Sequence, residues 1–259
     1  MNLSVVLITF NEENNLDRCL KSLPHGAEII IVDSGSQDRT GEIASSYGAR
    51  FQYRKFDDYS SQKNFALSLA QGKWILSLDA DEVLSEGCVK EIEKIILGNQ
   101  KTAYKINRHL YFMHKKMRFG KTRDHPIRLF PAGKGAFVGL IHESFEVEKD
   151  VATKKMGSKS IVYHYSYRDL EDYFDKFNRY TSRIAHNHWQ QNKSIPHKAI
   201  IAVRPWLEFF SRFILRGGLL DGYPGYVYAL LGSFYAFVKY EKFRQLSCSN
   251  ESRRSIDKR

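Results

Sequence analysis

The chain has 259 residues, of which 42% are hydrophobic and 27% are charged, and this composition excludes a disordered or fibrous protein. Three widely spaced cysteines exclude a disulfide framework and favour a reducing compartment. The net charge of +11 is uneven, because residues 1–100 carry 10 basic against 15 acidic side chains and the remainder carries 30 against 14. A basic second part suits nucleic acid, a membrane surface or a phosphorylated substrate, although it could be only a solvated face.

The first hundred residues alternate between apolar runs of strand length and segments with helical periodicity. Strands are predicted at 4–10, 28–32, 51–54 and 73–78, and helices after Asn11, at 40–47, at 60–70 and along the stripe of Val89, Ile92, Ile95 and Ile96. Asn11 is expected to cap the first helix, with Glu12 and Glu13 in its first turn. This alternation predicts an α/β fold with a doubly wound sheet and ligands at the carboxyl ends of its strands.

The character changes at about residue 101. Short strands are predicted at 103–106, 127–130, 137–141 and 161–165, and a long amphipathic helix carries apolar side chains at positions 170, 173, 174, 177, 180 and 184. We therefore expect one domain over 1–165, divided into halves at 100, then a helical region over 166–247 and a flexible tail over 248–259.

The helical region mixes apolar residues with Arg204, Arg212 and Arg216, and residues 222–238 carry no charge. Seventeen uncharged residues fall short of a comfortable membrane span. The region is expected to lie at a membrane interface, and an ordinary buried helical hairpin is the alternative. The first residues lack the basic start of a signal peptide, so none is expected.

Polar clusters follow three of the predicted strands, at 9–13, 33–38 and 79–82. Carboxylates such as Asp79 and Asp81 can hold a divalent cation that bridges phosphate oxygens, or they can be helix-capping acids in a solvated loop. Asp33 can accept hydrogen bonds from a base or ribose, or it can simply belong to a turn. The glycine patterns of dinucleotide-binding and P-loop proteins are absent from the sequence.

Three motifs at these positions carry a resemblance: TFNEE after the first strand, DSGSQD after the second and DADE after the fourth. Together they are similar to family 2 glycosyltransferases of the GT-A fold. The resemblance implies a nucleotide-sugar donor, a Mg²⁺ or Mn²⁺ ion on its diphosphate, and inversion at the anomeric carbon. It also implies donor-site roles for residues of the three loops and of the helix before the fourth strand: Thr9, Asn11, Glu13, Asp33, Lys63, Asn64, Asp79 and Asp81.

Later segments, RDHPIRLF, GLIHESF and VYHYSYRDL, resemble a branch of that family similar to lipopolysaccharide core glucosyltransferases. This implies UDP-glucose as donor, a lipid-linked saccharide such as the inner core as acceptor, and a peripheral position on an anionic membrane, at the cytoplasmic face. Glu143 is the candidate base, although the family has a Glu-Asp pair where this chain has His142-Glu143.

Two further residues have weaker predictions. His164 could complete the metal shell or could be an ordinary structural histidine. Arg128 could bind phosphate in a bidentate manner, and so could Arg123, or both could lie in a solvated basic loop.

Three alternatives remain open at this point. A polyprenyl-phosphate sugar transferase of the same fold would differ only in its acceptor. A sugar nucleotidyltransferase usually has a glycine-rich loop after its first strand, which TFNEENN lacks. A nucleic-acid-binding module would explain the charge but not the acidic strand ends, so no nucleic-acid partner is expected.

Overall fold

The computed structural model describes residues 2–98, 101–139 and 143–256, with side chains up to residue 248. The chain divides into two compact units. Unit 1 comprises Met1–Leu110 and Arg123–Ser166, and unit 2 comprises Tyr111–Thr122 and Tyr167–Arg259. The predicted segments at 140–142, including His142 and part of the strand expected at 137–141, lie outside the described residues.

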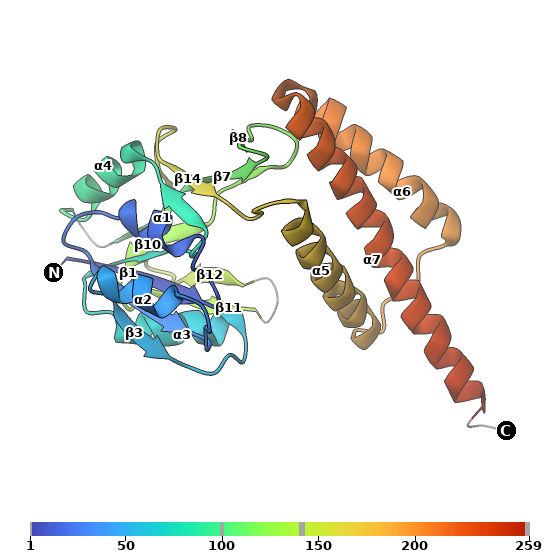
Figure 1. The fold of residues 1–259 in the computed structure, drawn as a ribbon, viewed down its shortest axis with the longest axis horizontal. Helices are drawn as coiled ribbons and strands as arrows, with labels where there is room; N and C mark the ends of the chain where they lie inside the picture. The colour runs from blue at the N-terminus through green and yellow to red at the C-terminus, as the bar shows by residue number, and fades with distance from the viewer. Residues whose placement is uncertain (1, 99–100, 140–142, 257–259) are drawn as a thin grey trace. The chain divides into compact units, whose positions relative to one another are not determined.

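Unit 1 is built on a seven-stranded sheet, counted over the described residues, with the order β13-β6-β10-β4-β1-β2-β3 (Figure 1). Its strands are β1 (Leu3–Thr9), β2 (Glu28–Asp33), β3 (Arg50–Tyr53), β4 (Trp74–Ser77), β6 (Thr102–Lys105), β10 (Ile127–Pro131) and β13 (Ala152–Lys155). Strands β3, β2, β1 and β4 are parallel, whereas β10 is antiparallel to both of its neighbours. The parallel half therefore comes from the first hundred residues, as predicted.

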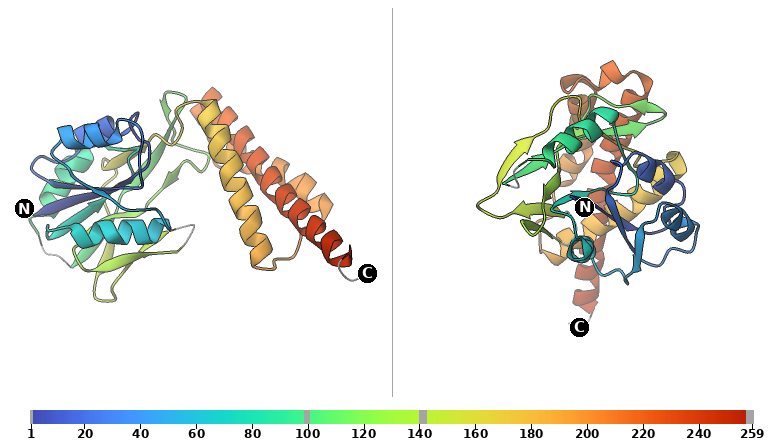
Figure 2. Two further views of the ribbon diagram at one scale, coloured as in Figure 1. Left: turned by 60° about the horizontal axis from the view of Figure 1, so that its bottom comes forward. Right: turned by 90° about the vertical axis from the view of Figure 1, so that its left-hand side faces the viewer.

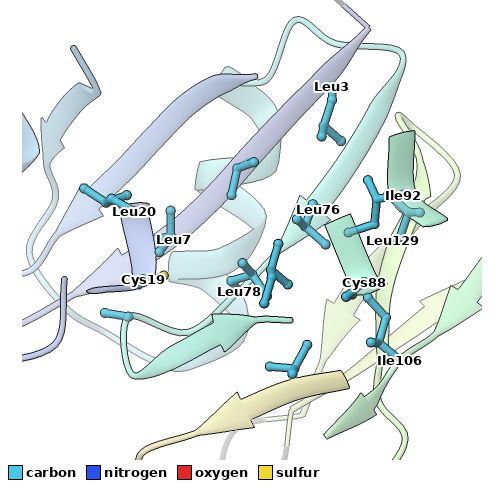
Figure 3. Close-up of a cluster of buried hydrophobic side chains, with 14 of the residues drawn as sticks. Leu3, Leu7, Cys19, Leu20, Leu76, Leu78, Cys88, Ile92, Ile106 and Leu129 are labelled. Atoms are coloured by element: carbon cyan, nitrogen blue, oxygen red, sulfur yellow. The ribbon is translucent and has the colours of Figure 1, made fainter. Parts of the chain in front are cut away.

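Alternate side chains of the parallel strands enter two separate cores, because successive residues of a strand point to opposite faces. Leu3, Val5 and Leu7 of β1 belong to one core, and Val6 belongs to the other. The first core also takes Leu76 of β4 and buried residues of three helices, many of which are labelled in Figure 3. Burial on both faces explains why these strands read as continuous apolar runs.

The helices of unit 1 are α1 (Leu16–Lys21), α2 (Thr40–Ser46), α3 (Tyr59–Leu69) and α4 (Glu86–Ile95). Residues of α1, α2 and α4 pack into the first core and Ala66 of α3 into the second, so that α1 and α2 lie on the opposite face of the sheet from α3 (Figure 2, left). The side chains of Asp58 and Ser85 cap α3 and α4 by accepting hydrogen bonds from backbone N–H groups.

The predicted start of the first helix is wrong. Helix α1 begins at Leu16, after Asn15, and Asn11 stands five residues earlier with a left-handed φ of 56°. The Asn11 side chain is engaged elsewhere, because its Oδ1 accepts a hydrogen bond from the Gln37 N–H at 2.9 Å. Asn11 thus joins two loops instead of capping a helix.

Several strands outside the seven-stranded sheet were not predicted. A five-stranded sheet contains β14 (Ile161–His164), which was predicted, together with β5 (Glu82–Leu84), β7 (Asn107–Phe112), β8 (Lys115–Lys116) and β9 (Arg123–Asp124), which were not. A separate hairpin joins β11 (Gly135–Val138) to β12 (Ser144–Val147). In the second core, on the same face as α3, Phe145 of this hairpin stacks on Phe130, and Phe137 contacts Phe130 edge to face.

Unit 2 is helical, apart from the end of β7 and β8. It contains α5 (Leu170–Gln190), α6 (Lys198–Phe210), the π-helix η1 (Ser211–Leu215), the 3₁₀-helix η2 (Gly218–Asp221) and α7 (Tyr223–Ile256). Tyr173 and Phe177 of α5 are buried, and Phe177 stacks on Phe234 of α7. Helix α7 continues to Ile256, eight residues beyond the predicted start of the tail at 248.

The mixed α/β fold with a C-terminal helical region is therefore confirmed. The helices among the described residues are each too short or too polar to cross a bilayer.

Candidate active site

The three predicted polar clusters lie at the carboxyl ends of neighbouring parallel strands. Thr9 at the end of β1 pairs in register with Asp33 at the end of β2. Asp79 follows β4, which pairs with the other side of β1. Because the carboxyl ends of these parallel strands meet at one edge of the sheet, all three clusters lie along that edge.

The first two loops are joined through Asp33, which is 3% exposed. Its Oδ2 accepts hydrogen bonds from the Thr9 hydroxyl at 2.8 Å and the Ser36 hydroxyl at 2.5 Å. Its Oδ1 accepts from the N–H groups of Gly35 and Ser36. Gly35 has a φ of 103°, which a residue with a side chain rarely adopts, so it permits this turn. The Asp33 carboxylate therefore fixes the shape of the loop.

Asn11 and Glu13 add further bonds between the same loops. In addition to the Asn11 bond to Gln37, Glu13 Oε2 accepts from the Arg39 N–H at 3.1 Å, and the Glu13 N–H donates to Asp38 Oδ2 at 3.0 Å. The structure thus brings four of the predicted donor-site residues together: Thr9, Asn11, Glu13 and Asp33. The two loops form one cross-linked wall.

A second group gathers around Asp79. The ammonium of Lys63, on α3, lies 2.8 Å from Asp79 Oδ1, and the guanidinium of Arg128, on β10, lies 2.6 Å from Asp79 Oδ2. Arg128 reaches this position because β10 pairs antiparallel with β4, which Asp79 follows. Burial alone would raise the pKa of Asp79, but Arg128 and then Lys63 outweigh it and hold that pKa well below its usual range.

Lys63 also contacts the candidate base. Its ammonium lies 3.0 Å from Glu143 Oε1, so one buried cation joins Asp79 to Glu143. Helix α3 is fixed to β11, the strand that precedes Glu143, because Asn64 donates to the Phe137 carbonyl and accepts from the Phe137 N–H, each at 2.8 Å. The family resemblance implies a donor-site role for Asn64, whereas in the structure its side chain anchors β11.

Three residues of this cluster were not selected as site residues from the sequence. Glu82 is fully buried, and its Oε1 pairs with Arg128 and with Arg108, the latter at 3.0 Å. Arg108 also forms two hydrogen bonds with Asp124 across the β7–β9 pair. The only available signal was that Glu82 ends the DADE motif. Arg128 is 4% exposed and forms ion pairs with Asp79 and Glu82. These ion pairs give Arg128 a structural role as an alternative to the predicted role of phosphate ligand.

A third group consists of Asp81 and His164. Their Oδ2 and Nε2 atoms lie 3.3 Å apart, because β14 pairs with β5 and the Tyr165 N–H donates to the Asp81 carbonyl at 2.8 Å. Burial lowers the pKa of His164, but the neighbouring Asp81 carboxylate outweighs this and leaves it raised. His164 also bonds to the hydroxyl of Ser166.

These two side chains fit a divalent cation as partial ligands. A carboxylate oxygen is the ligand that Mg²⁺ and Mn²⁺ prefer, and a neutral imidazole is a common additional ligand. Within the described ranges, no three His, Cys, Asp or Glu side chains form a potential metal site. A metal held by Asp81 and His164 would therefore need further ligands from a substrate or water.

Replacing Lys63 with methionine is expected to destabilise unit 1 by about 2 kcal/mol, because Asp79 and Glu143 lose their shared cation. The cost stays below that of a fully buried pair, since the two carboxylate side chains are 29% and 24% exposed. Urea unfolding would be followed by Trp74 fluorescence after Trp189 and Trp206 have been changed to phenylalanine. The control is Lys73→Met, at an exposed lysine. Equal midpoints for both variants would contradict the bridging role.

Comparison with known proteins agrees with the motifs. The family model described as Glycosyl transferase family 2 matches residues 4–164. An uncharacterised glycosyltransferase of Rickettsia bellii is 33% identical over an alignment that covers 98% of this chain and 90% of the relative. The lipopolysaccharide core biosynthesis glycosyltransferase LpsC of Rhizobium meliloti is 29% identical, over 94% of this chain and 92% of its own length.

Solved structures resemble the fold at low sequence identity. Residues 1–349 of S. aureus TarS, in complex with UDP-GlcNAc, match with a TM-score of 0.44 and 15% identity, over 97% of this chain and 92% of that chain. Glucosyl-3-phosphoglycerate synthase from Mycobacterium tuberculosis, in complex with Mn²⁺, UDP and its product, matches with a TM-score of 0.43 and 16% identity, over 66% and 74%.

The mixed α/β sheet with acidic strand ends is that of a GT-A-like glycosyltransferase. The chain belongs to glycosyltransferase family 2, and it is a glycosyltransferase. The family model ends at residue 164, so the helices of unit 2 lie beyond it, although the relatives align over nearly the whole chain.

Proposed function

We propose that the enzyme transfers glucose from UDP-glucose, with inversion and with a divalent metal, onto a lipid-linked saccharide such as the inner core of lipopolysaccharide. The observation that carries this proposal is the Lys63 ammonium, which contacts Asp79 Oδ1 at 2.8 Å and Glu143 Oε1 at 3.0 Å. The buried ammonium of Lys63 therefore contacts both Asp79, a residue of the predicted donor site, and Glu143, the predicted base.

The cross-linked loops after β1 and β2 are the proposed nucleotide site. Thr9, Asn11, Glu13 and Asp33 are expected to bind the nucleoside or to shape the wall against which it lies. Because the Asp33 carboxylate already accepts four hydrogen bonds within the protein, its contribution is expected to be mainly positional. Asp79 and the guanidinium of Arg128 would lie toward the sugar-diphosphate.

Asp81 and His164 are the proposed metal ligands. When bound, Mg²⁺ or Mn²⁺ would neutralise the negative charge of the diphosphate leaving group. The pairing of β5 with β14 holds a carboxylate oxygen of Asp81 and an imidazole nitrogen of His164 at 3.3 Å from each other.

Glu143 is the proposed general base. Its carboxylate would take the proton of the acceptor hydroxyl as that oxygen forms a bond to the anomeric carbon. The bond from that carbon to the diphosphate oxygen breaks on the opposite face, and its electron pair leaves with the nucleotide. Lys63 orients Glu143 through the 3.0 Å contact and so acts as a positioning residue.

The acceptor and location are proposed from the relatives and from charge. The similarity to LpsC over most of both chains supports an anionic lipid-linked saccharide. The excess of basic residues after residue 100 suits an anionic membrane, and a nucleotide-sugar donor implies the cytoplasmic face of the cytoplasmic membrane.

The direct test is a transfer assay with UDP-glucose, Mn²⁺ and purified lipid-linked saccharides truncated at successive core sugars, with polyprenyl phosphate as a separate acceptor. We expect a β-linked glucose on one truncated core, identified by the anomeric coupling in NMR. An α-linked product would contradict the inverting mechanism. A product on polyprenyl phosphate alone would establish the alternative acceptor, and transfer from another nucleotide sugar alone would replace the donor.

A further inference from the structure

Helix α6 has its polar side turned inward. Glu208 Oε1 accepts hydrogen bonds from Lys121 at 2.7 Å and from Arg212 at 2.8 Å, both within unit 2. Burial alone would raise the pKa of Glu208, but these two cations outweigh it and lower that pKa. Arg204, one turn earlier, lies over the ring of Tyr240 on α7. Glu208 and Arg204 therefore contact other parts of unit 2, whereas Lys198 at the start of α6 is exposed.

The opposite side of α6 exposes large apolar side chains to solvent. They recur at helical spacing, with exposed fractions that run from 51% to 77%: Ile200, Val203, Trp206, Leu207 and Phe210. A surface helix of a water-soluble unit usually buries such a stripe and exposes its charges. A groove along α6 is lined by Ile200, Val203 and Leu207 of this stripe and also by the polar residues Arg204, Glu208 and Ser211.

The exposed apolar surface continues past the end of α6, where Figure 1 shows the chain turn back into α7. Its further members come from η1, η2 and the start of α7: Ile214, Leu215, Leu219, Leu220 and Tyr223. We call these five residues and the five of α6 the apolar face. Single exposed apolar residues need no explanation, but a contiguous set of this size marks an interaction site.

The turn that carries part of this face is firmly built. Asp221 is 2% exposed, and its Oδ2 accepts hydrogen bonds from the N–H groups of Arg118 at 2.9 Å and Phe119 at 2.8 Å. Gly217 and Gly222 take left-handed φ angles of 69° and 66° at the two ends of η2. Leu219 and Leu220 are thus held outward by a structured turn.

The exposed charges of the segment that carries the apolar face are of one sign. Between residues 191 and 238 the acidic residues are Glu208 and Asp221, and both carboxylates are bonded within unit 2. The exposed ionised side chains of this segment are basic: Lys193, Lys198, Arg204 and Arg216. An apolar face with a basic border complements a bilayer surface that contains anionic lipids.

We infer that the apolar face inserts into the interfacial region of an anionic bilayer, with Trp206, Leu207 and Leu215 among its most exposed members. The inference deepens the proposed function, since it names the surface that would bring the enzyme to a lipid-linked acceptor. The test of this inference needs neither donor nor acceptor. Membrane binding can therefore be disproved while the proposed transfer reaction is confirmed, and the transfer reaction can be disproved while membrane binding is confirmed.

The experiment is sedimentation of the full chain with vesicles of phosphatidylcholine, alone or mixed with phosphatidylglycerol. We expect strong binding only to the mixed vesicles, weakened by salt. The triple variant Trp206→Ser, Leu207→Ser, Leu215→Ser should bind about 100-fold more weakly, because three large apolar side chains leave the interface. In a Trp74→Phe, Trp189→Phe background, the emission of Trp206 should shift to the blue on binding.

Matched control variants distinguish a loss of binding caused by changes in the apolar face from a loss that any surface substitution would cause. Leu215→Ser and Leu97→Ser both change a leucine that is more than 70% exposed, but only Leu215 belongs to the apolar face. Removal of two basic residues by Lys198→Gln with Arg216→Gln is compared with Lys73→Gln and Lys90→Gln, which are exposed lysines of unit 1. Far-UV circular dichroism checks that each variant is folded.

Several outcomes would overturn the inference. They are wild-type protein that stays in the supernatant with both vesicle types, a triple variant that binds as tightly as wild type, and equal losses for Leu215→Ser and Leu97→Ser. A lipid-free dimer that dissociates in the triple variant, together with no vesicle binding, would assign the apolar face to a second copy of the chain instead.

Discussion

Replacing Glu143 with glutamine is expected to lower kcat by about three orders of magnitude and to leave donor binding unchanged. Glutamine has nearly the shape of glutamate, and its carbonyl oxygen can still accept from Lys63, which lies 3.0 Å from Glu143 Oε1 in the wild type. The amide cannot take a proton from an acceptor hydroxyl. The change therefore removes the proposed base with little change to the surrounding ion pairs.

The measurement compares kcat with the dissociation constant of UDP for the same preparation. Glu146→Gln is the matched control, because Glu146 is an exposed residue of the neighbouring strand β12. We expect the control to keep wild-type kcat. A Glu143→Gln enzyme with near-wild-type turnover would show that the base lies elsewhere.

Replacing Asp81 with asparagine is expected to weaken metal binding in the presence of UDP by about 100-fold. The substitution keeps the size of the side chain and the Asp81 carbonyl that accepts from the Tyr165 N–H, but it removes the carboxylate beside His164. Turnover should fall with metal occupancy and recover in part at high Mn²⁺ concentration.

Metal binding is read directly from the loss of the free Mn²⁺ signal in electron paramagnetic resonance, so the test does not depend on activity. Asp150→Asn serves as control, since Asp150 is an exposed acid that pairs with Lys134. An Asp81→Asn protein that takes up Mn²⁺ as tightly as wild type would exclude Asp81 as a ligand.

The parallel half of the sheet could be predicted because its strands are buried on both faces. Residues 4–10 and 28–32 therefore read as unbroken apolar runs, and the structure has strands there. The short strands β7, β9, β12 and β13 lack this signal. Every residue of β13 is exposed, so no apolar pattern indicates a strand.

The motifs predicted which loops meet at the sheet edge, but not how their charges pair. Arg108 contacts Glu82, 26 residues away in sequence, and only the folded sheets bring the two together. The interpretation of Arg128 as a phosphate ligand followed from its chemistry alone. Its burial against Asp79 and Glu82 depends on the pairing of β10 with β4, which the sequence does not reveal.

The helical region illustrates a different limit. Periodicity predicted an amphipathic helix over α5 and apolar segments beyond Pro196, but periodicity does not determine which side of a helix faces inward. In α6 the choice depends on Lys121, which lies far away in sequence, in the turn between β8 and β9, and binds Glu208. The outward apolar face follows from that inward ion pair.

We propose a metal-dependent uridine nucleotide site at the carboxyl edge of the sheet. The decisive measurement is the melting temperature of the wild-type protein with UDP, GDP, ADP or CDP, each with Mn²⁺ or with EDTA. A ligand that binds only the native state raises this temperature. We expect a rise with UDP and Mn²⁺ that EDTA abolishes. An unchanged melting temperature with saturating UDP and Mn²⁺, or an equal rise with all four nucleotides in EDTA, would contradict it.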